Sequence, residues 1–231
     1  MPFLLVNKPA GITSHDVVDR VRKITGEQRV GHAGTLDPFA TGLLIVGVGR
    51  ESTKHLDTFL GMPKTYEATI RIGQSSTTLD PEGVIEDATP TDPITAEALE
   101  AAMKNLTGDL QQIPPMHSAI KIGGKKLYEL ARKGIEIDRP PRAVTVTRFE
   151  ATIPLLPTTY TPPFNLPVII DCSSGTYIRA LARDLGETLG TKAYLTALCR
   201  GAIGPYTLAG ATDLGALTPE NWQLLAKNLM P

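Results

Sequence analysis

The amino-acid sequence predicts an α+β fold. Apolar runs typical of strands alternate with amphipathic stretches typical of helices, but without the regular strand–helix–strand rhythm of a doubly wound parallel sheet. Neither an internal repeat nor a low-complexity tract interrupts the pattern. With 231 residues, 42% hydrophobic and 20% charged, the chain is long enough to bury one large core or two small ones.

The N-terminal part opens with an apolar run at Phe3–Val6. A helix follows, with Ser14 as its expected N-cap and Gly26 as its stop. Glycines punctuate GHAGTLDPFATG, residues 31–42, which predicts a loop. The elements predicted next, in chain order, are a buried strand at Leu43–Val48, a short helix at Ser52–Leu60 and an alternating strand at Thr65–Ile72.

The rest of the chain continues with an acidic, proline-marked connection from Pro81 to Pro93. Thr95 then caps a helix that runs to Leu106. The later elements, in chain order, are a strand-like stretch at 118–122, a basic helix at 125–134, strands at Ala143–Ile153 and Pro167–Cys172, a helix opened by Ser174 or Thr176 and ending at Gly190, a strand around Ala209 and a helix after Thr218-Pro219.

Several chemistries lack their sequence signatures. Cys172 and Cys199 are far apart and form no C-x-x-C pair, and neither H-E-x-x-H nor an EF-hand loop occurs. IGGKK lacks the first glycine and the Ser/Thr of a phosphate loop, and CSSG is not a G-x-S-x-G elbow. We therefore expect no metal and no cofactor.

The charge distribution is uneven, although the net charge is only −1. Between Leu79 and Asp109 there are eight acidic residues and one basic residue, whereas Leu110 to Arg148 holds eight basic residues and three acidic ones. This contrast fits either an RNA-binding face with a repelling back or two unrelated solvated surfaces. Charge alone favours the second interpretation.

Asp37 precedes Pro38, and an Asp-Pro pair on its own is typical of a helix start, where Asp caps the first turn. The surrounding glycines favour another role, because they let a large ligand approach the backbone closely. His32 lies on the same loop, five residues earlier. Such a loop suits a carboxylate that is presented to a substrate.

Four blocks, NKPAGITS, RVGHAGTLDPFATGLL, KTYEATIRIG and CSSGTYIRALARDLG, resemble the TruB family of tRNA pseudouridine synthases. The resemblance runs in order from about Leu4 to Pro205. It implies a pseudouridine synthase fold, with a mixed, mainly antiparallel sheet flanked by helices and an inserted thumb segment at about 110–134. It also implies isomerisation of uridine to pseudouridine at position 55, in the T-loop of tRNA.

The resemblance assigns the catalytic roles. Asp37 is implied as the carboxylate that reacts, and it could attack the sugar, attack the base, or deprotonate the sugar. Arg179, in GTYIR, is implied to pair with Asp37 and keep it ionised. Tyr66 is implied to stack on the target base and help remove the C5 proton. Without the resemblance, Arg179 reads as an exposed helix residue and Tyr66 as an inward-packing strand residue.

The resemblance also implies contacts with RNA. His32 would occupy the space that the flipped uridine leaves in the stack. Leu198 would pack near the target base, although an ordinary core role suits it almost as well, and Lys8 would lie near the active site. The further residues expected to bind RNA are Lys121, Lys125, Lys126, Arg132 and Arg200.

We expect one catalytic domain over 1–231 with a short C-terminal helical tail at 210–231, leaving no room for the PUA module of many relatives. Cys199 and Thr77 stand where the family more often has a basic residue and an aspartate. The T-arm of tRNA is the expected partner, with no membrane and no obligate protein partner, for a cytoplasmic monomer. The alternatives are a tRNA-folding chaperone with minor or lost catalysis and the RNA-guided branch of the same superfamily.

Overall fold

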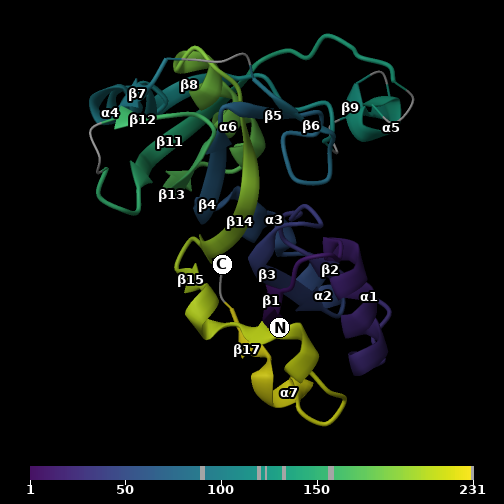
Figure 1. Cartoon of the computed structure of the whole chain (residues 1–231). Helices are drawn as coiled ribbons and strands as arrows, with labels where there is room; N and C mark the ends of the chain where they lie inside the picture. Colours follow the sequence, from purple (N-terminus) through teal and green to yellow (C-terminus); the bar gives the residue numbers. More distant parts are fainter. Residues whose placement is uncertain (89–91, 119–120, 123, 132–133, 156–158, 230–231) are drawn as a thin grey trace. The chain divides into compact units, whose positions relative to one another are not determined.

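The computed structural model describes the chain except for residues 89–91, 119–120, 123, 132–133, 156–158 and 230–231 (Figure 1). It divides into two compact units. Unit 1 comprises Met1–Glu67 and Leu198–Pro231, and unit 2 comprises Ala68–Ala197. Strands β4 (Lys64–Ile72) and β14 (Ala193–Ile203) each contribute residues to both units.

Unit 1 is built on strands in the order β16-β1-β3-β14. β1 (Pro2–Lys8) pairs antiparallel with β3 (Thr41–Val48), and β14 runs parallel to β3 with Arg200 beside Gly42. The short strands are β2 (Val30–His32), β15 (Tyr206–Thr207), β16 (Thr212–Asp213) and β17 (Lys227–Asn228).

Helices cover both faces of β1 and β3. On one face, Leu4 and Val46 pack against Val17 and Val21 of helix α1 (Ser14–Thr25). On the other face, alternate strand residues such as Phe3 and Ile45 pack around Phe59 of helix α3 (Leu56–Gly61). Burial on both faces explains why these strands read as continuous apolar runs. The other helices of unit 1 are α2 (Arg50–Thr53), α7 (Trp222–Leu225) and the 3-10 helices η1 (Leu208–Gly210) and η2 (Leu214–Ala216).

Unit 2 has strands in the order β14-β4-β13-β11-β8. β11 (Arg142–Ala151) lies between β13 (Phe164–Cys172) and β8 (Gly108–Gln112), and it is antiparallel to both. The main helices are α4 (Ala96–Asn105) and α6 (Ile178–Thr188). The smaller elements are the pairs β5 (Gln74–Ser76) with β6 (Ile85–Asp87), β7 (Ile94–Thr95) with β12 (Thr159–Tyr160), β9 (Lys121–Ile122) with β10 (Lys125–Lys126), and helix α5 (Leu127–Ala131).

The predicted α+β class, with a mixed and mainly antiparallel sheet, is confirmed. Several details of the sequence-based assignment are wrong. The helix expected at Ser52–Leu60 is two helices, and the helix expected to open at Ser174 or Thr176 begins at Ile178. Ala209 lies in a 3-10 helix rather than a strand, and β8 and β14 were not predicted. The β14 sequence, AYLTALCRGAI, contains Ala and Leu that also suit helices, so pairing with distant strands decides its structure.

Gly42 offers a test of how β14 packs on β3. Its φ is +104°, and an added Cβ would lie 2.5 Å from the Arg200 main-chain oxygen. Gly42→Ala should therefore lower the free energy of unfolding by at least about 2 kcal/mol, measured by urea denaturation. The control is Gly61→Ala, where a Cβ would meet open space. Equal unfolding midpoints for the two variants would contradict this packing.

Candidate active site

Asp37 opens a tight turn in the loop between β2 and β3. The Ala40 amide donates to the Asp37 carbonyl at 3.1 Å, and residues 38–39 form a turn, not a helix. The helix-capping interpretation of Asp37-Pro38 is therefore wrong. Asp37 itself is partly buried.

Helix α1 fixes the residue before Asp37. The helix starts with a capping box, in which the Thr13 hydroxyl accepts from the Asp16 amide while the Asp16 carboxylate accepts from the Thr13 amide. Ser14, predicted as the cap, is the first helical residue. Its buried hydroxyl accepts from the Leu36 amide at 2.8 Å and lies 3.2 Å from the Leu36 carbonyl, to which it donates.

Lys8 fixes the residue after Asp37. It ends β1 and is fully buried, so its ammonium group needs partners in place of water. Its Nζ donates to the carbonyls of Pro38 at 3.2 Å, Ile12 at 2.7 Å and Pro9 at 2.9 Å. This burial makes Lys8 a support for the turn and does not fit a lysine on an RNA-binding surface.

Arg200 holds the same loop from β14. Its side chain is 1% exposed. Nε donates to the Leu43 carbonyl at 2.8 Å, and Nη2 donates to the Gly34 carbonyl at 3.0 Å. Burial at this position does not fit the expected surface contact with RNA. Arg200 instead joins the start of β3 to the glycine-rich part of the loop.

His32 lies at the end of β2, in register with Val46 of β3. Among the described residues its Nδ1 is buried and has no hydrogen-bond partner. Burial lowers the pKa of His32 below its usual 6.5, and the positive charges of Arg200 and His15 lower it further, against a smaller opposing effect of the Gly34 backbone. The imidazole therefore resists protonation.

Tyr66 and Leu198 also belong to unit 1. Tyr66 lies on the buried face of β4, and Leu198 is a buried residue of β14 whose carbonyl accepts from the Thr41 hydroxyl at 3.5 Å. Unit 1 thus contains six of the predicted site residues, Lys8, His32, Asp37, Tyr66, Leu198 and Arg200. Four of them, Lys8, His32, Asp37 and Arg200, belong to the loop or its supports.

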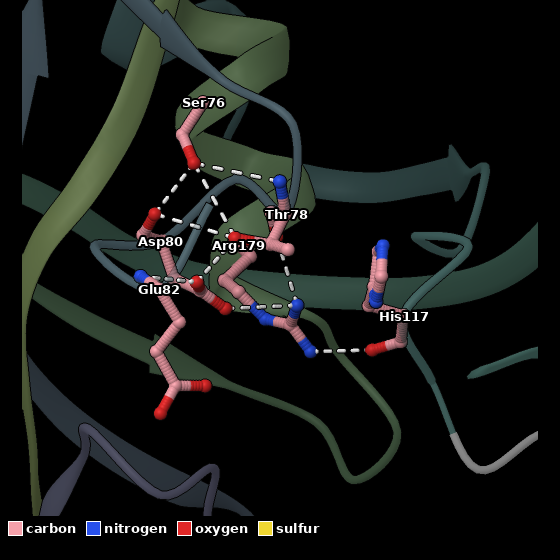
Figure 2. Close-up of polar contacts among 6 residues, drawn as sticks. All are labelled: Ser76, Thr78, Asp80, Glu82, His117 and Arg179. Atoms are coloured by element: carbon pink, nitrogen blue, oxygen red, sulfur yellow. Dashed lines mark hydrogen bonds and ion pairs between the residues drawn. The ribbon is translucent and has the colours of Figure 1, made fainter. Parts of the chain in front are cut away.

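Arg179 lies in the first turn of α6 in unit 2 and is buried, not exposed (Figure 2). Its Nη1 lies 3.1 Å from Asp80 Oδ2 and donates to the Thr78 carbonyl at 2.9 Å. Nη2 donates to the His117 carbonyl at 2.7 Å. The guanidinium is therefore bound between two segments of the chain, 76–82 and 112–118.

Asp80 is a site residue that sequence reasoning missed. Only 4% of its side chain is exposed, and its Oδ1 accepts from the Glu82 amide at 3.0 Å and from the Thr78 hydroxyl (Figure 2). In the sequence it is one acid among eight in an acidic stretch. The turn letters LDPEG were its only local signal.

The predicted RNA-binding lysines of the thumb segment fall in a small hairpin. Lys121 and Lys126 are paired across β9 and β10, and Lys125 pairs with Ile122. Arg132 lies outside the described residues. Within the part of the chain that is described, no cluster of His, Cys, Asp or Glu could hold a metal ion, and no helix is long and apolar enough to cross a membrane.

The Asp80–Arg179 pair predicts a large effect on stability. Removing one partner of a buried pair leaves the other charge uncompensated, so Asp80→Asn should lower the free energy of unfolding by about 3 kcal/mol. Asp87, on exposed β6, accepts one bond from Gln74 at 2.8 Å, so Asp87→Asn is the matched control. Urea denaturation that gives the two variants equal stability would contradict the importance of the pair.

His32 predicts a pH dependence. Since its pKa is lower in the folded chain than in the unfolded chain, its contribution to stability is complete above pH 6.5 and is lost as the pH falls through the folded pKa. An NMR titration of the imidazole should have its midpoint below 6.5. His32→Gln should remove this component from the pH dependence of unfolding. A midpoint at or above 6.5 would show that burial does not control this histidine.

Comparison with known proteins places the chain in a family. Residues 22–178 match the N-terminal domain of the TruB family pseudouridylate synthases. The chain is 47% identical over 215 residues to tRNA pseudouridine synthase B of Mycobacterium tuberculosis, covering 93% of this chain and 71% of that protein. For the same enzyme of Arthrobacter sp. the identity is 45%, with 99% and 76% covered.

Solved structures share the fold. A Cbf5-Nop10-Gar1 complex matches with a TM-score of 0.71 at 24% identity, and an archaeal box H/ACA sRNP Nop10-Cbf5 complex matches with 0.67 at 22%. Each match covers 96% of this chain, which spans 55% of the matched chain. Since the family model covers more than half of the sequence and the bacterial relatives are almost half identical, the chain belongs to the TruB family of pseudouridylate synthases.

Proposed function

We propose that the chain isomerises uridine to pseudouridine in tRNA, at position 55 of the T-loop, with Asp37 as the catalytic carboxylate. The observation that carries the proposal is the Asp37 turn, whose neighbours Leu36 and Pro38 are bound by Ser14 and Lys8. A carboxylate held at a fixed place is what a reaction at one carbon of a bound nucleotide requires. The relatives named tRNA pseudouridine synthase B support tRNA as the substrate.

The reaction is an isomerisation, so its atoms balance without an oxidant or a second substrate. The bond between N1 of the base and C1′ of the ribose breaks, the base rotates, and C5 bonds to C1′. C5 then loses its proton to solvent and N1 takes up a proton, so the number of protons is unchanged. Asp37 acts by nucleophilic attack on sugar or base, or by deprotonating the sugar. The uridine reaches it by leaving the base stack.

Arg179, Tyr66 and His32 have separate roles in the proposed reaction. Arg179 pairs with Asp37 and favours its ionised form, and the bonds of Arg179 to Asp80 and Thr78 set the direction of the guanidinium. Tyr66 stacks on the target base and helps to remove the C5 proton. His32 occupies the space left by the flipped base, and its lowered pKa means that it does so as a neutral ring.

Lys8 and Arg200 position the Asp37 loop, and Leu198 packs close to the base. RNA phosphates contact the thumb segment through Lys121, Lys125, Lys126 and Arg132, which makes tRNA affinity fall as salt rises. The protein acts in the cytoplasm as a monomer, with tRNA as its partner and without an obligate protein partner.

Asp37→Asn tests the function. With tRNA carrying tritium at C5 of uridine, the wild-type protein should release tritium, and the variant should release it at less than about one thousandth of that rate because the reacting carboxylate is gone. The variant should still bind tRNA, measured by filter binding.

The matched control is Asp57→Asn, an exposed acid on α3, which should keep the wild-type rate. Release by Asp37→Asn at the wild-type rate would refute the assignment of Asp37. Wild-type protein that binds tRNA but releases no tritium would favour the chaperone alternative.

A further inference from the structure

The segment that starts at the last residue of β8 is bound through its main chain. This root segment, Gln112–Ser118, contains Pro114-Pro115, which have no amide hydrogen and so cannot continue the pairing of β8 with β11. Three arginines donate to its carbonyls. Arg183 Nη2 lies 3.2 Å from Ile113 O, Arg139 Nη1 3.3 Å from Pro114 O, and Arg179 Nη2 2.7 Å from His117 O.

Two of these arginines are neighbours on α6. Arg179 and Arg183 are four residues apart and therefore lie on the same face of the helix. Gln112 fixes the start of that helix, because its buried amide accepts from the Tyr177 amide at 2.8 Å and donates to the Tyr177 carbonyl at 3.1 Å. The root segment and α6 are thus joined at both ends of the segment.

Arg183 is oriented by the next residue. Its Nε and Nη2 both donate to Asp184 Oδ1, at 2.9 and 2.7 Å. The same Nη2 reaches the Ile113 carbonyl, which is the first carbonyl after β8. Arg183 is therefore held in the one direction that binds the beginning of the root segment.

We propose that Arg183 is a positioning residue for the isomerisation: by binding Ile113 O it fixes the root segment, so that the His117 carbonyl keeps the Arg179 guanidinium in place. The inference rests on the proposed function, in which Arg179 acts with Asp37. The root segment is one of the two segments that bind Arg179, so a shift of its main chain moves an acceptor of that guanidinium (Figure 2).

The bond of Arg183 to Ile113 O and its ion pair with Asp184, whose side chains are 21% and 25% exposed, both lie near solvent and contribute little to stability, so loss of Arg183 should appear in the rate rather than in folding. Displacement of a catalytic group by about 1 Å can slow a reaction by about 100-fold. Arg183 acts on Arg179 only through the root segment. We therefore expect the loss of Arg183 to slow the reaction by less than this figure of about 100-fold.

Arg183→Gln tests the proposal, with Arg183→Lys as the conservative variant and exposed Lys104→Gln as the control for a lost charge. Under single-turnover conditions Arg183→Gln should release tritium about 10-fold more slowly, with the tRNA Kd within about 2-fold of wild type. Hydrogen exchange should be faster over Gln112–Ser118 and unchanged over β11. Arg183→Lys keeps one donor for Ile113 O and should fall between Arg183→Gln and wild type.

Several results would overturn the proposal. A wild-type rate in Arg183→Gln would do so, with or without faster exchange in the root segment. A 10-fold weaker tRNA Kd with an unchanged single-turnover rate would also overturn it, because the root segment would then serve to bind tRNA. An Arg183→Lys rate as slow as the Arg183→Gln rate would overturn it as well. If Arg183→Gln does not fold, Arg183→Lys is compared with wild type, and an unchanged rate and exchange overturn the proposal. Wild-type protein that releases no tritium would instead refute the proposed function itself.

Discussion

Buried cations bound to main-chain carbonyls determine the geometry of the Asp37 loop. Lys8 and Arg200 are almost completely buried, and both donate to main-chain carbonyls that fix the loop, Lys8 to Pro38 and Arg200 to Gly34 and Leu43. Removing a positive charge from water is costly unless its donors are satisfied. The loop can therefore move only if these donors lose partners, and this cost keeps Asp37 at one position.

Unit 2 uses the same interaction around Arg179, with one addition. The guanidinium binds the carbonyls of Thr78 and His117, and the carboxylate of Asp80 balances its charge. Each carbonyl belongs to a segment with little regular structure, so the arginine takes the place of a sheet partner. In both units, a cation from a strand or helix binds carbonyls of irregular segments, those of Gly34 and Pro38 in unit 1 and those of Thr78 and His117 in unit 2.

The sequence was informative where the signal is local. The period of α1, the apolar runs of β1 and β3 and the Thr95 cap of α4 all follow from neighbouring residues, and the structure has these elements. Family motifs supplied the candidate site residues. Neither source could predict that Arg200 is buried, because it binds carbonyls more than 150 residues away along the chain.

Asp80 and β14 escaped prediction for the same reason. Asp80 looks like any member of an acidic stretch until Arg179, about 100 residues later, pairs with it. β14 becomes a strand because it pairs with β3 and β4, which lie far earlier in the chain. Long-range partners, and not local propensity, determined these features.

A hydrogen bond from a side chain to a main-chain carbonyl constrains the sequence more strongly at the donor residue than at the acceptor residue. The atoms that Arg183 and Arg200 bind include the carbonyl oxygens of Ile113 and Leu43, which every amino acid possesses. A substitution at the residue that supplies the carbonyl preserves such a contact as long as the backbone conformation is unchanged. A substitution of the arginine that donates the hydrogen bond removes the contact. Substitutions should therefore be tolerated better at residues that contribute only a carbonyl than at the few buried or oriented cations that bind those carbonyls.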